Sequence, residues 1–235
     1  MTVRASLEGR AACVFDAYGT LFDFSAPATR CAAGLGPKAE ALTQRWRDKQ
    51  LQYTWLRSLQ ARYVDFEQVT ADALDYALDS LAIINPGLRN ELLALYRCLP
   101  AFTDARPALE VLRSLGTRSI ILSNGTPTML DHSVRAAGLD HLVEGIVSVD
   151  RIGVYKPDSR VYQMAVDALG VSKDRIVFVS ANGWDAYAGA AFGFRAVWCN
   201  RAGAPVERLP GVPDRQIRSL DELPSSFHEG TPQAR

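Results

Sequence analysis

The chain has 235 residues, of which 48% are apolar, so it can bury a sizeable core as one large domain or as a core with an insertion. Its 26 Lys and Arg residues equal its 26 Asp and Glu residues, which argues against nucleic acid or an anionic membrane as a partner. No apolar run approaches the length of a membrane span.

The first ten residues lack the apolar segment of a signal peptide. The four cysteines are far apart and form no C-x-x-C pair, which argues against a zinc site; they stand at positions 13, 31, 98 and 199. We therefore expect a cytoplasmic protein with reduced thiols and no metal or other cofactor. The tail from Ser225 to Arg235 is expected to be frayed.

The first predicted element is a short apolar strand over residues 11–15, which ends at Asp16. Gly19 follows and allows a sharp turn, so the amides of Ala17 to Thr20 could converge on an anion. Asp16 would then stand at the carboxyl end of a strand, where open parallel sheets bind ligands. Taken alone, the stretch fits a solvated turn equally well.

Residues 21–101 are predicted to form a helical insertion. The periodicity favours helices over 39–62, 68–81 and 88–99, the second opened by Thr70 and Asp72 and the third preceded by Pro86-Gly87. On the first helix the core-facing residues recur at near-helical spacing, and we expect them to be Leu42, Trp46, Tyr53 and Leu56. Arg47, Leu51 and Trp55 form an adjacent row on that helix.

After this insertion, strands alternate with helices. Helices are predicted over 107–115, 128–137 and 160–169, with a fourth through Ala190; strands are predicted over 119–122, 145–149, 176–179 and 195–199. The fold class is therefore α/β, a Rossmann-like doubly wound parallel sheet with an inserted α-helical cap. Residues 1–20 and 102–235 would form the core, and residues 21–101 the cap.

Polar residues gather in the loops that follow the predicted strands. These loops carry Asp16, Ser123, Lys156 and Asp185, and parallel strands align such loops along one edge of a sheet. We therefore expect the four side chains to meet in one cleft, which the helical insertion could cover.

Four segments in this order resemble the four motifs of the haloacid dehalogenase superfamily: Phe15 to Thr20, Leu122 to Gly125, Tyr155 to Asp158 and Phe178 to Asp185. Within that superfamily the chain is similar to the L-2-haloacid dehalogenases, whose cap pattern residues 46–57 also match. The resemblance covers nearly the whole chain. It implies hydrolysis of short L-2-halo acids to D-2-hydroxy acids through an ester on Asp16, and a homodimer.

The resemblance also implies roles for individual residues. Arg47, with Asn124 and Phe66, would cradle the halide, and Ser123, Lys156 and the amides from Ala17 onward would hold the substrate carboxylate. Asn182 and Asp185 would orient the hydrolytic water. The apolar pocket would be lined by Tyr18, Leu51, Phe66 and Trp184, and further functional positions of the family match Thr20, Tyr162 and Ser180.

Two alternatives remain open at this point. A magnesium phosphatase of the same superfamily needs a second Asp two residues after the nucleophile, where this chain has Tyr18, and a metal-binding acid where it has Ser180. A halide leaving group needs no general acid, so the sequence favours dehalogenation without a metal. A non-catalytic Rossmann-like binding module is the second alternative.

Several of these residues also have a purely structural interpretation. Trp46 and Trp55 are expected in the cap core, Tyr162 in helix packing, and Asp185 as a helix N-cap compatible with a catalytic role. Asp48 and Ala181 depart from the family pattern. Asp48 could pair with Arg47 or face solvent.

Overall fold

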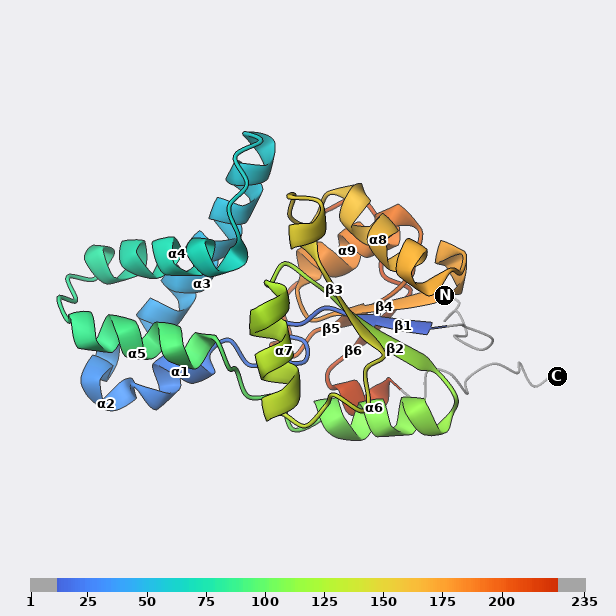
Figure 1. The fold of residues 1–235 in the computed structure, drawn as a ribbon, viewed down its shortest axis with the longest axis horizontal. Coiled ribbons are helices and arrows are strands. Elements are labelled where there is room, and N and C mark those ends of the chain that lie inside the picture. The colour runs from blue at the N-terminus through green and yellow to red at the C-terminus, as the bar shows by residue number, and fades with distance from the viewer. Residues whose placement is uncertain (1–11, 224–235) are drawn as a thin grey trace.

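The computed structural model describes residues 12–223, and these form a parallel α/β core with a helical insertion (Figure 1). The expectations about the N-terminal ten residues and the tail from Ser225 lie outside this range. The sheet has six strands in the order β3-β2-β1-β4-β5-β6, and each neighbouring pair is parallel. Their bounds are β1 Ala12–Phe15, β2 Arg118–Ser123, β3 Gly145–Ser148, β4 Ile176–Ser180, β5 Arg195–Cys199 and β6 Arg215–Ile217.

The central strands form where the sequence has uninterrupted apolar runs. Every residue of β1 and β4 is buried, because helices cover both faces of the sheet. The five predicted strands are confirmed to within two residues. The prediction missed β6, whose Arg215 and Gln216 give no apolar run; of its three residues only Ile217 is buried.

Four α-helices pack on the sheet: α6 Ala105–Ser114, α7 Pro127–Ala136, α8 Ser159–Leu169 and α9 Gly183–Phe192. Figure 1 shows α8 and α9 together on one side of the sheet and α6 on the other. Each of these helices was predicted from the glycine that follows it and from the alternation of helices with strands. Short 3-10 helices occupy 149–151, 173–175 and 220–222.

The insertion between β1 and α6 is helical, as predicted. It contains α1 Ala26–Arg30, α2 Ala32–Leu35, a 3-10 helix at 36–38, α3 Ala39–Leu59, α4 Phe66–Ser80 and α5 Pro86–Tyr96. Figure 1 shows these helices gathered beside the core. The sequence analysis missed α1 and α2, because helices of four or five residues are too short for a helical period to be recognised.

The chain enters and leaves the insertion through two paired segments. The amide of Asp23 donates to the carbonyl of Pro100 at 2.9 Å, and the amide of Phe102 donates to the carbonyl of Leu21 at 2.9 Å. Phe22 and Ala101 form an antiparallel bridge between them. This paired hinge lies where the core and cap were predicted to meet.

The predicted start of α4 is wrong. The helix begins at Phe66, and Asp65 caps it by accepting a hydrogen bond from the amide of Gln68 at 2.8 Å. Thr70 lies inside the helix. In the same way α5 begins at Pro86, because Asn85 caps it.

The buried stripe of α3 also differs from the prediction. Leu42 and Trp46 are buried as expected, but Leu56 is 44% exposed and Tyr53 is half-buried. The stripe continues instead through Gln50 and Thr54, which are 1% and 0% exposed. Polar residues can be buried there because both side chains have hydrogen-bond partners.

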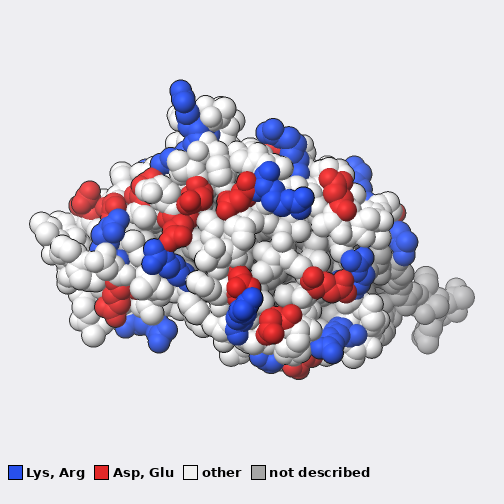
Figure 2. Space-filling view, in the orientation of Figure 1, with Lys and Arg blue, Asp and Glu red and all other residues white. Residues whose placement is uncertain are grey.

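Two further expectations concern thiols and membranes. The four cysteines are unpaired, with three buried and Cys98 exposed, so the prediction of free thiols is confirmed. Within residues 12–223, none of the helices is long and apolar enough to cross a membrane. Figure 2 shows acidic and basic side chains intermixed over the face in view, as their equal numbers suggest.

Candidate active site

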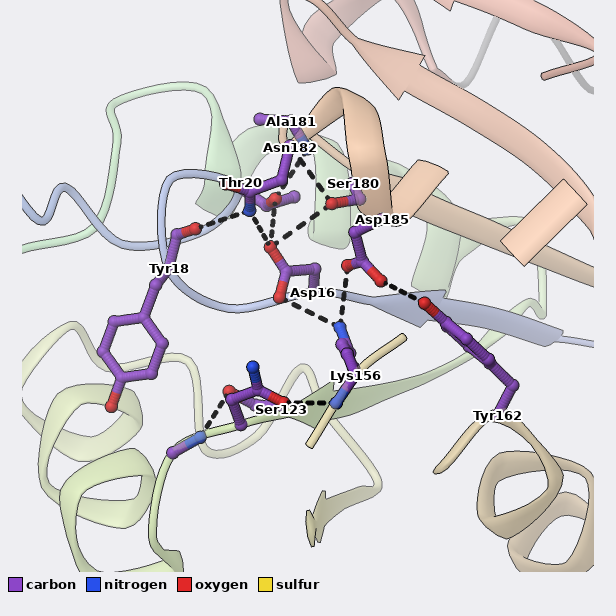
Figure 3. A network of polar contacts seen from close by, with 12 residues as sticks. Asp16, Tyr18, Thr20, Ser123, Lys156, Tyr162, Ser180, Ala181, Asn182 and Asp185 are labelled. Atoms are coloured by element: carbon purple, nitrogen blue, oxygen red, sulfur yellow. Dashed lines mark hydrogen bonds and ion pairs between the residues drawn. The ribbon is translucent and has the colours of Figure 1, made fainter. Parts of the chain in front are cut away.

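Two residues at strand ends, one in the first turn of a helix and one loop lysine meet at the carboxyl edge of the sheet (Figure 3). Asp16 follows β1, Ser123 ends β2, and Asp185 lies in the first turn of α9 after β4. Lys156 comes from the loop between β3 and α8. The predicted convergence of these loops is therefore what the parallel sheet produces.

Lys156 joins the two carboxylates. Its Nζ lies 3.1 Å from Oδ1 of Asp16 and 2.8 Å from Oδ2 of Asp185. The lysine is 1% exposed, and the carboxylates are 6% and 0% exposed. Because these charges are almost wholly buried, the ion pairs are largely shielded from the screening that weakens surface pairs.

The second oxygen of Asp16 is held by neutral donors. Oδ2 accepts a hydrogen bond from Oγ1 of Thr20 at 2.9 Å and one from Nδ2 of Asn182 at 2.8 Å. Oγ of Ser180 lies 3.4 Å away, a longer contact. Thr20 is fixed in turn, since its hydroxyl accepts from the amide of Ala181 at 2.8 Å. Both carboxylate oxygens of Asp16 therefore have polar partners that fix the side chain.

Burial and charge act against each other on these groups. Burial lowers the pKa of Lys156, but the charges of Asp16 and Asp185 outweigh it and raise that pKa above its ordinary value. Burial raises the pKa of Asp185, which Lys156 partly offsets. Lys156 is therefore a permanent cation.

Tyr162 completes the cluster from α8. Its hydroxyl donates to Oδ1 of Asp185 at 2.7 Å, and burial raises its pKa well above the ordinary value, so it stays a donor. The expected helix packing is also present, since its ring lies 5.7 Å from that of Phe178. Asp185 is not the N-cap of α9; Asn182 occupies that place.

The turn after Asp16 is less open to an anion than expected. The amides of Gly19 and Thr20 bond to the carbonyls of Phe22 and Ala17. Gly19 has a φ of +88°, which explains the glycine at this turn. The prediction that all the amides of residues 17–20 converge on an anion is therefore wrong for these two.

Arg47 reaches this cluster from the insertion. Its Nη2 donates to Oδ1 of Asn182 at 3.0 Å, and its guanidinium carbon lies 4.7 Å above the ring of Phe24. Asp48 is exposed and accepts from Gln44, so it faces solvent. Leu51, one turn beyond Arg47, is half-buried.

An aromatic group borders the turn that follows Asp16. The ring of Tyr18 lies 5.1 Å from Phe66 and 5.7 Å from Tyr96. Its buried hydroxyl has no hydrogen-bond partner within the described range, and it would lie 2.6 Å from a Cβ at Gly125, which explains the glycine there. The predicted pocket residues Tyr18 and Phe66 are thus in contact.

The polar residues after β2 are also partly engaged. Oδ1 of Asn124 accepts from the amide of Lys156 at 3.0 Å, and Oγ of Ser123 accepts from the amide of Gly125 at 3.1 Å. The Ser123 hydroxyl proton and the Asn124 amide NH₂ group remain as donors.

A cavity of about 740 Å³ lies between the tip of α3 and the core. Trp55, Trp184 and Lys156 are among its lining residues. The two tryptophan rings meet edge to face at 5.5 Å. Trp55 therefore lines a cavity and is not cap core, whereas Trp46 is buried and donates to the carbonyl of Thr70, as expected of a core residue.

Three residues near Arg47 escaped the sequence analysis: Phe24, Gln50 and Tyr96. Gln50 lies one turn from Arg47, but its partner Tyr96 is 46 residues further on. Only the amphipathic pattern of α3, with a polar residue on its buried stripe, could have pointed to Gln50.

Among residues 12–223 no three His, Cys, Asp or Glu side chains cluster in a way that could hold a metal ion.

Comparisons with known proteins agree on one family. Residues 11–193 match the model for haloacid dehalogenase-like hydrolases. The (S)-2-haloacid dehalogenase 1 of Pseudomonas sp. (strain CBS-3) is 44% identical over 91% of this chain and 94% of its own. The (S)-2-haloacid dehalogenase 4A of Burkholderia cepacia is 43% identical over 90% and 92%.

A solved structure is similar to this chain in the same way. The L-2-haloacid dehalogenase from Xanthobacter autotrophicus, determined with chloropropionic acid covalently bound, superposes with a TM-score of 0.86. It is 33% identical, and the match covers 94% of this chain and 100% of that one.

Proposed function

The chain belongs to the haloacid dehalogenase-like hydrolases that cleave carbon–halide bonds, and we propose that it converts short L-2-halo acids to D-2-hydroxy acids and halide. Asp16 would be the nucleophile and no metal would take part. The observation that carries the proposal is Lys156, whose Nζ stands between the carboxylates of Asp16 and Asp185. A buried cation there supplies the charge balance that a phosphatase would take from magnesium.

In the first step Oδ1 of Asp16 attacks Cα of the substrate. Oδ1 accepts one hydrogen bond, from Lys156, whereas Oδ2 is held by Thr20 and Asn182, so Oδ1 has the more available lone pair. The Oδ1–Cα bond forms as the carbon–halogen bond breaks, and the halide leaves with the bonding electrons. A single displacement inverts Cα, which turns an L acid into a D product.

The departing halide would be solvated by Arg47 and by the amide NH₂ group of Asn124, beside Phe66. Asn182 links Arg47 to the proposed nucleophile, because it accepts a hydrogen bond from Arg47 and donates one to Asp16. The substrate carboxylate would be held by Ser123, Lys156 and the amides that directly follow Asp16, including that of Ala17. The apolar substituent would face Tyr18, Leu51 and Trp184.

In the second step water attacks Cγ of the ester. Oδ2 then carries the negative charge and is stabilised by Thr20, Asn182 and, more distantly, Ser180. Asp185 would accept the water proton, with Tyr162 and Lys156 holding it in place. When the Cγ–Oδ1 bond breaks, Oδ1 leaves as the hydroxyl oxygen of the product and takes the proton that Asp185 had accepted. The water oxygen remains on Asp16, and its second proton is released to solvent.

The covalent ester is supported by the Xanthobacter autotrophicus relative, which was solved with chloropropionic acid covalently bound. The division into a core of residues 1–20 and 102–235 and a cap of residues 21–101 is supported by the paired hinge. A cytoplasmic location and a homodimer stay predictions, which cell fractionation and light scattering would test.

The test is halide release from L- and D-2-chloropropionate in the presence of EDTA, with Asp16→Asn as the inactive control. We expect chloride and D-lactate from the L enantiomer alone. No chloride from either enantiomer would overturn the proposal. Activity that EDTA abolishes, with turnover of a phosphate ester in Mg²⁺, would favour the phosphatase alternative.

A further inference from the structure

Gln50 is a buried polar residue on α3 to which the proposed reaction gives no role. It is 1% exposed and lies one turn after Arg47. An uncharged amide inside a helical bundle is costly unless each of its polar atoms is paired. Its partners therefore reveal what the position requires.

Both ends of the Gln50 amide are bonded. Oε1 accepts from Nη1 of Arg47 at 2.8 Å and lies 3.2 Å from the hydroxyl of Tyr96, while Nε2 donates to Oγ1 of Thr70 at 2.7 Å. The Thr70 hydroxyl in turn donates to the carbonyl of Phe66 at 2.6 Å. A chain of hydrogen bonds thus runs from the backbone of α4 to the guanidinium.

This chain allows one orientation of the amide. The Thr70 hydroxyl has a single proton, and it is used on the Phe66 carbonyl, so Oγ1 can only accept from Gln50. The NH₂ end of Gln50 must therefore point to Thr70, and the oxygen must point to Arg47. Arg47 then meets an acceptor whose direction is set by a second helix.

We propose that Gln50 is a positioning residue that holds the Arg47 guanidinium against the leaving halide. The inference rests on the proposed function, in which Arg47 solvates that ion. A free arginine side chain has many rotamers, and ordering it during the reaction would cost free energy. Gln50 on one guanidinium nitrogen, Asn182 on another and Phe24 beneath the plane fix it beforehand.

The choice of halogen makes this role measurable. Chloride is a poorer leaving group than bromide, so displacement of chloride depends more on a cation placed at the departing atom. Loss of positioning should therefore slow release of chloride more than release of bromide. A general weakening of the fold would slow both alike.

The experiment compares Gln50→Met with Thr54→Val, using L-2-chloropropionate and L-2-bromopropionate. Methionine keeps the volume and removes the acceptor. Thr54 is a matched control one turn further along the same buried stripe, where its hydroxyl bonds, within residues 12–223, only to the carbonyl of Leu51. We expect kcat of Gln50→Met on the chloro acid to fall on the order of 10–100-fold, with a smaller fall on the bromo acid. Thr54→Val should leave both rates near the wild type.

Two further variants keep the test sharp. Thr70→Val removes the group that orients the amide, so it should reproduce the chloro-selective loss in weaker form even if Gln50→Met folds poorly. In an Arg47→Lys background the effect of Gln50→Met should shrink, because the residue acts through Arg47. Equal losses on both substrates, or full additivity with Arg47→Lys, would overturn the inference. A wild type that releases neither halide would overturn the proposed function itself, and the role of Gln50 with it.

Discussion

Asp185 lies where solvent does not reach, and in the proposed reaction its protonation sets the acid limb of the pH profile. Burial raises its pKa above the ordinary 3.8, so the carboxylate is lost at a higher pH than an exposed Asp would lose it. The hydrogen bond from Tyr162 lowers this pKa by stabilising the charged form.

Tyr162→Phe should therefore move the acid limb of the kcat profile, which includes ester hydrolysis, upward by about one pH unit, which is the worth of one hydrogen bond to a charge. Tyr187→Phe is the matched control, because Tyr187 is a buried tyrosine of α9 that packs on Trp198. A limb that stays in place in Tyr162→Phe would show that Asp185 is not the group that accepts the proton.

The two oxygens of Asp16 have different environments, and this has an isotopic consequence. If Oδ1 attacks the substrate, it leaves with the product, and solvent oxygen enters the enzyme. In ¹⁸O-water, a single turnover should yield unlabelled hydroxy acid and a labelled Asp16 peptide, measured by mass spectrometry. Label in the product of the first turnover would mean that water attacks Cα directly. Asp16→Asn supplies the unlabelled peptide control.

At the scale of the elements, α4 supplies both Phe66 and Thr70, and its first turn depends on Asp65. Asp65→Ala should lower the free energy of unfolding by about 1 kcal/mol, because the amide of Gln68 loses its acceptor. Urea denaturation measures this. Asp79→Ala removes the same charge from the last turn of α4, where the helix dipole disfavours an acid, so it should be neutral or slightly stabilising. Equal losses in the two variants would contradict the cap.

At the scale of the whole molecule, Arg201 ties three distant segments together beside the hinge. It makes two hydrogen bonds to Asp104, at 2.6 and 2.9 Å, and donates to the carbonyl of Thr20 at 2.9 Å. Asp104 also accepts from Ser219 and from the amide of Leu220. Burial alone would raise the pKa of Asp104, but these bonds lower it below its ordinary 3.8.

Arg201→Met should destabilise the protein by about 2 kcal/mol near pH 7, since it leaves a buried carboxylate without its cation. A lowered pKa stabilises the fold above the ordinary value, and this contribution is lost as pH falls through the lowered one. The difference between variant and wild type should therefore narrow below pH 3.8. Urea denaturation near pH 7 and again below pH 3.8 measures this difference in the free energy of unfolding. If the difference is the same at both pH values, Asp104 is not the group whose titration causes it.

The sheet and most helices were predictable because their signal is local. Short apolar runs rich in β-branched residues, such as Ile176 to Val179, indicate buried strands, and glycines such as Gly170 mark helix ends. The convergence of Asp16 and Lys156 also followed, since parallel strands share an edge. Contacts between segments far apart in the chain could not be predicted from the sequence, because no local pattern marks them. They are Gln50 with Tyr96, Trp55 with Trp184, and the pairing of β6.

The burial of Lys156 has a practical consequence for handling the protein. The chain has four lysines; Lys38 and Lys173 are exposed, Lys49 is half-buried, and Lys156 is 1% exposed. Amine-reactive dyes and activated-ester beads will therefore couple through the first three. The protein can be tethered by ordinary lysine chemistry, at the insertion or at the core, while the ammonium group beside Asp16 remains unmodified.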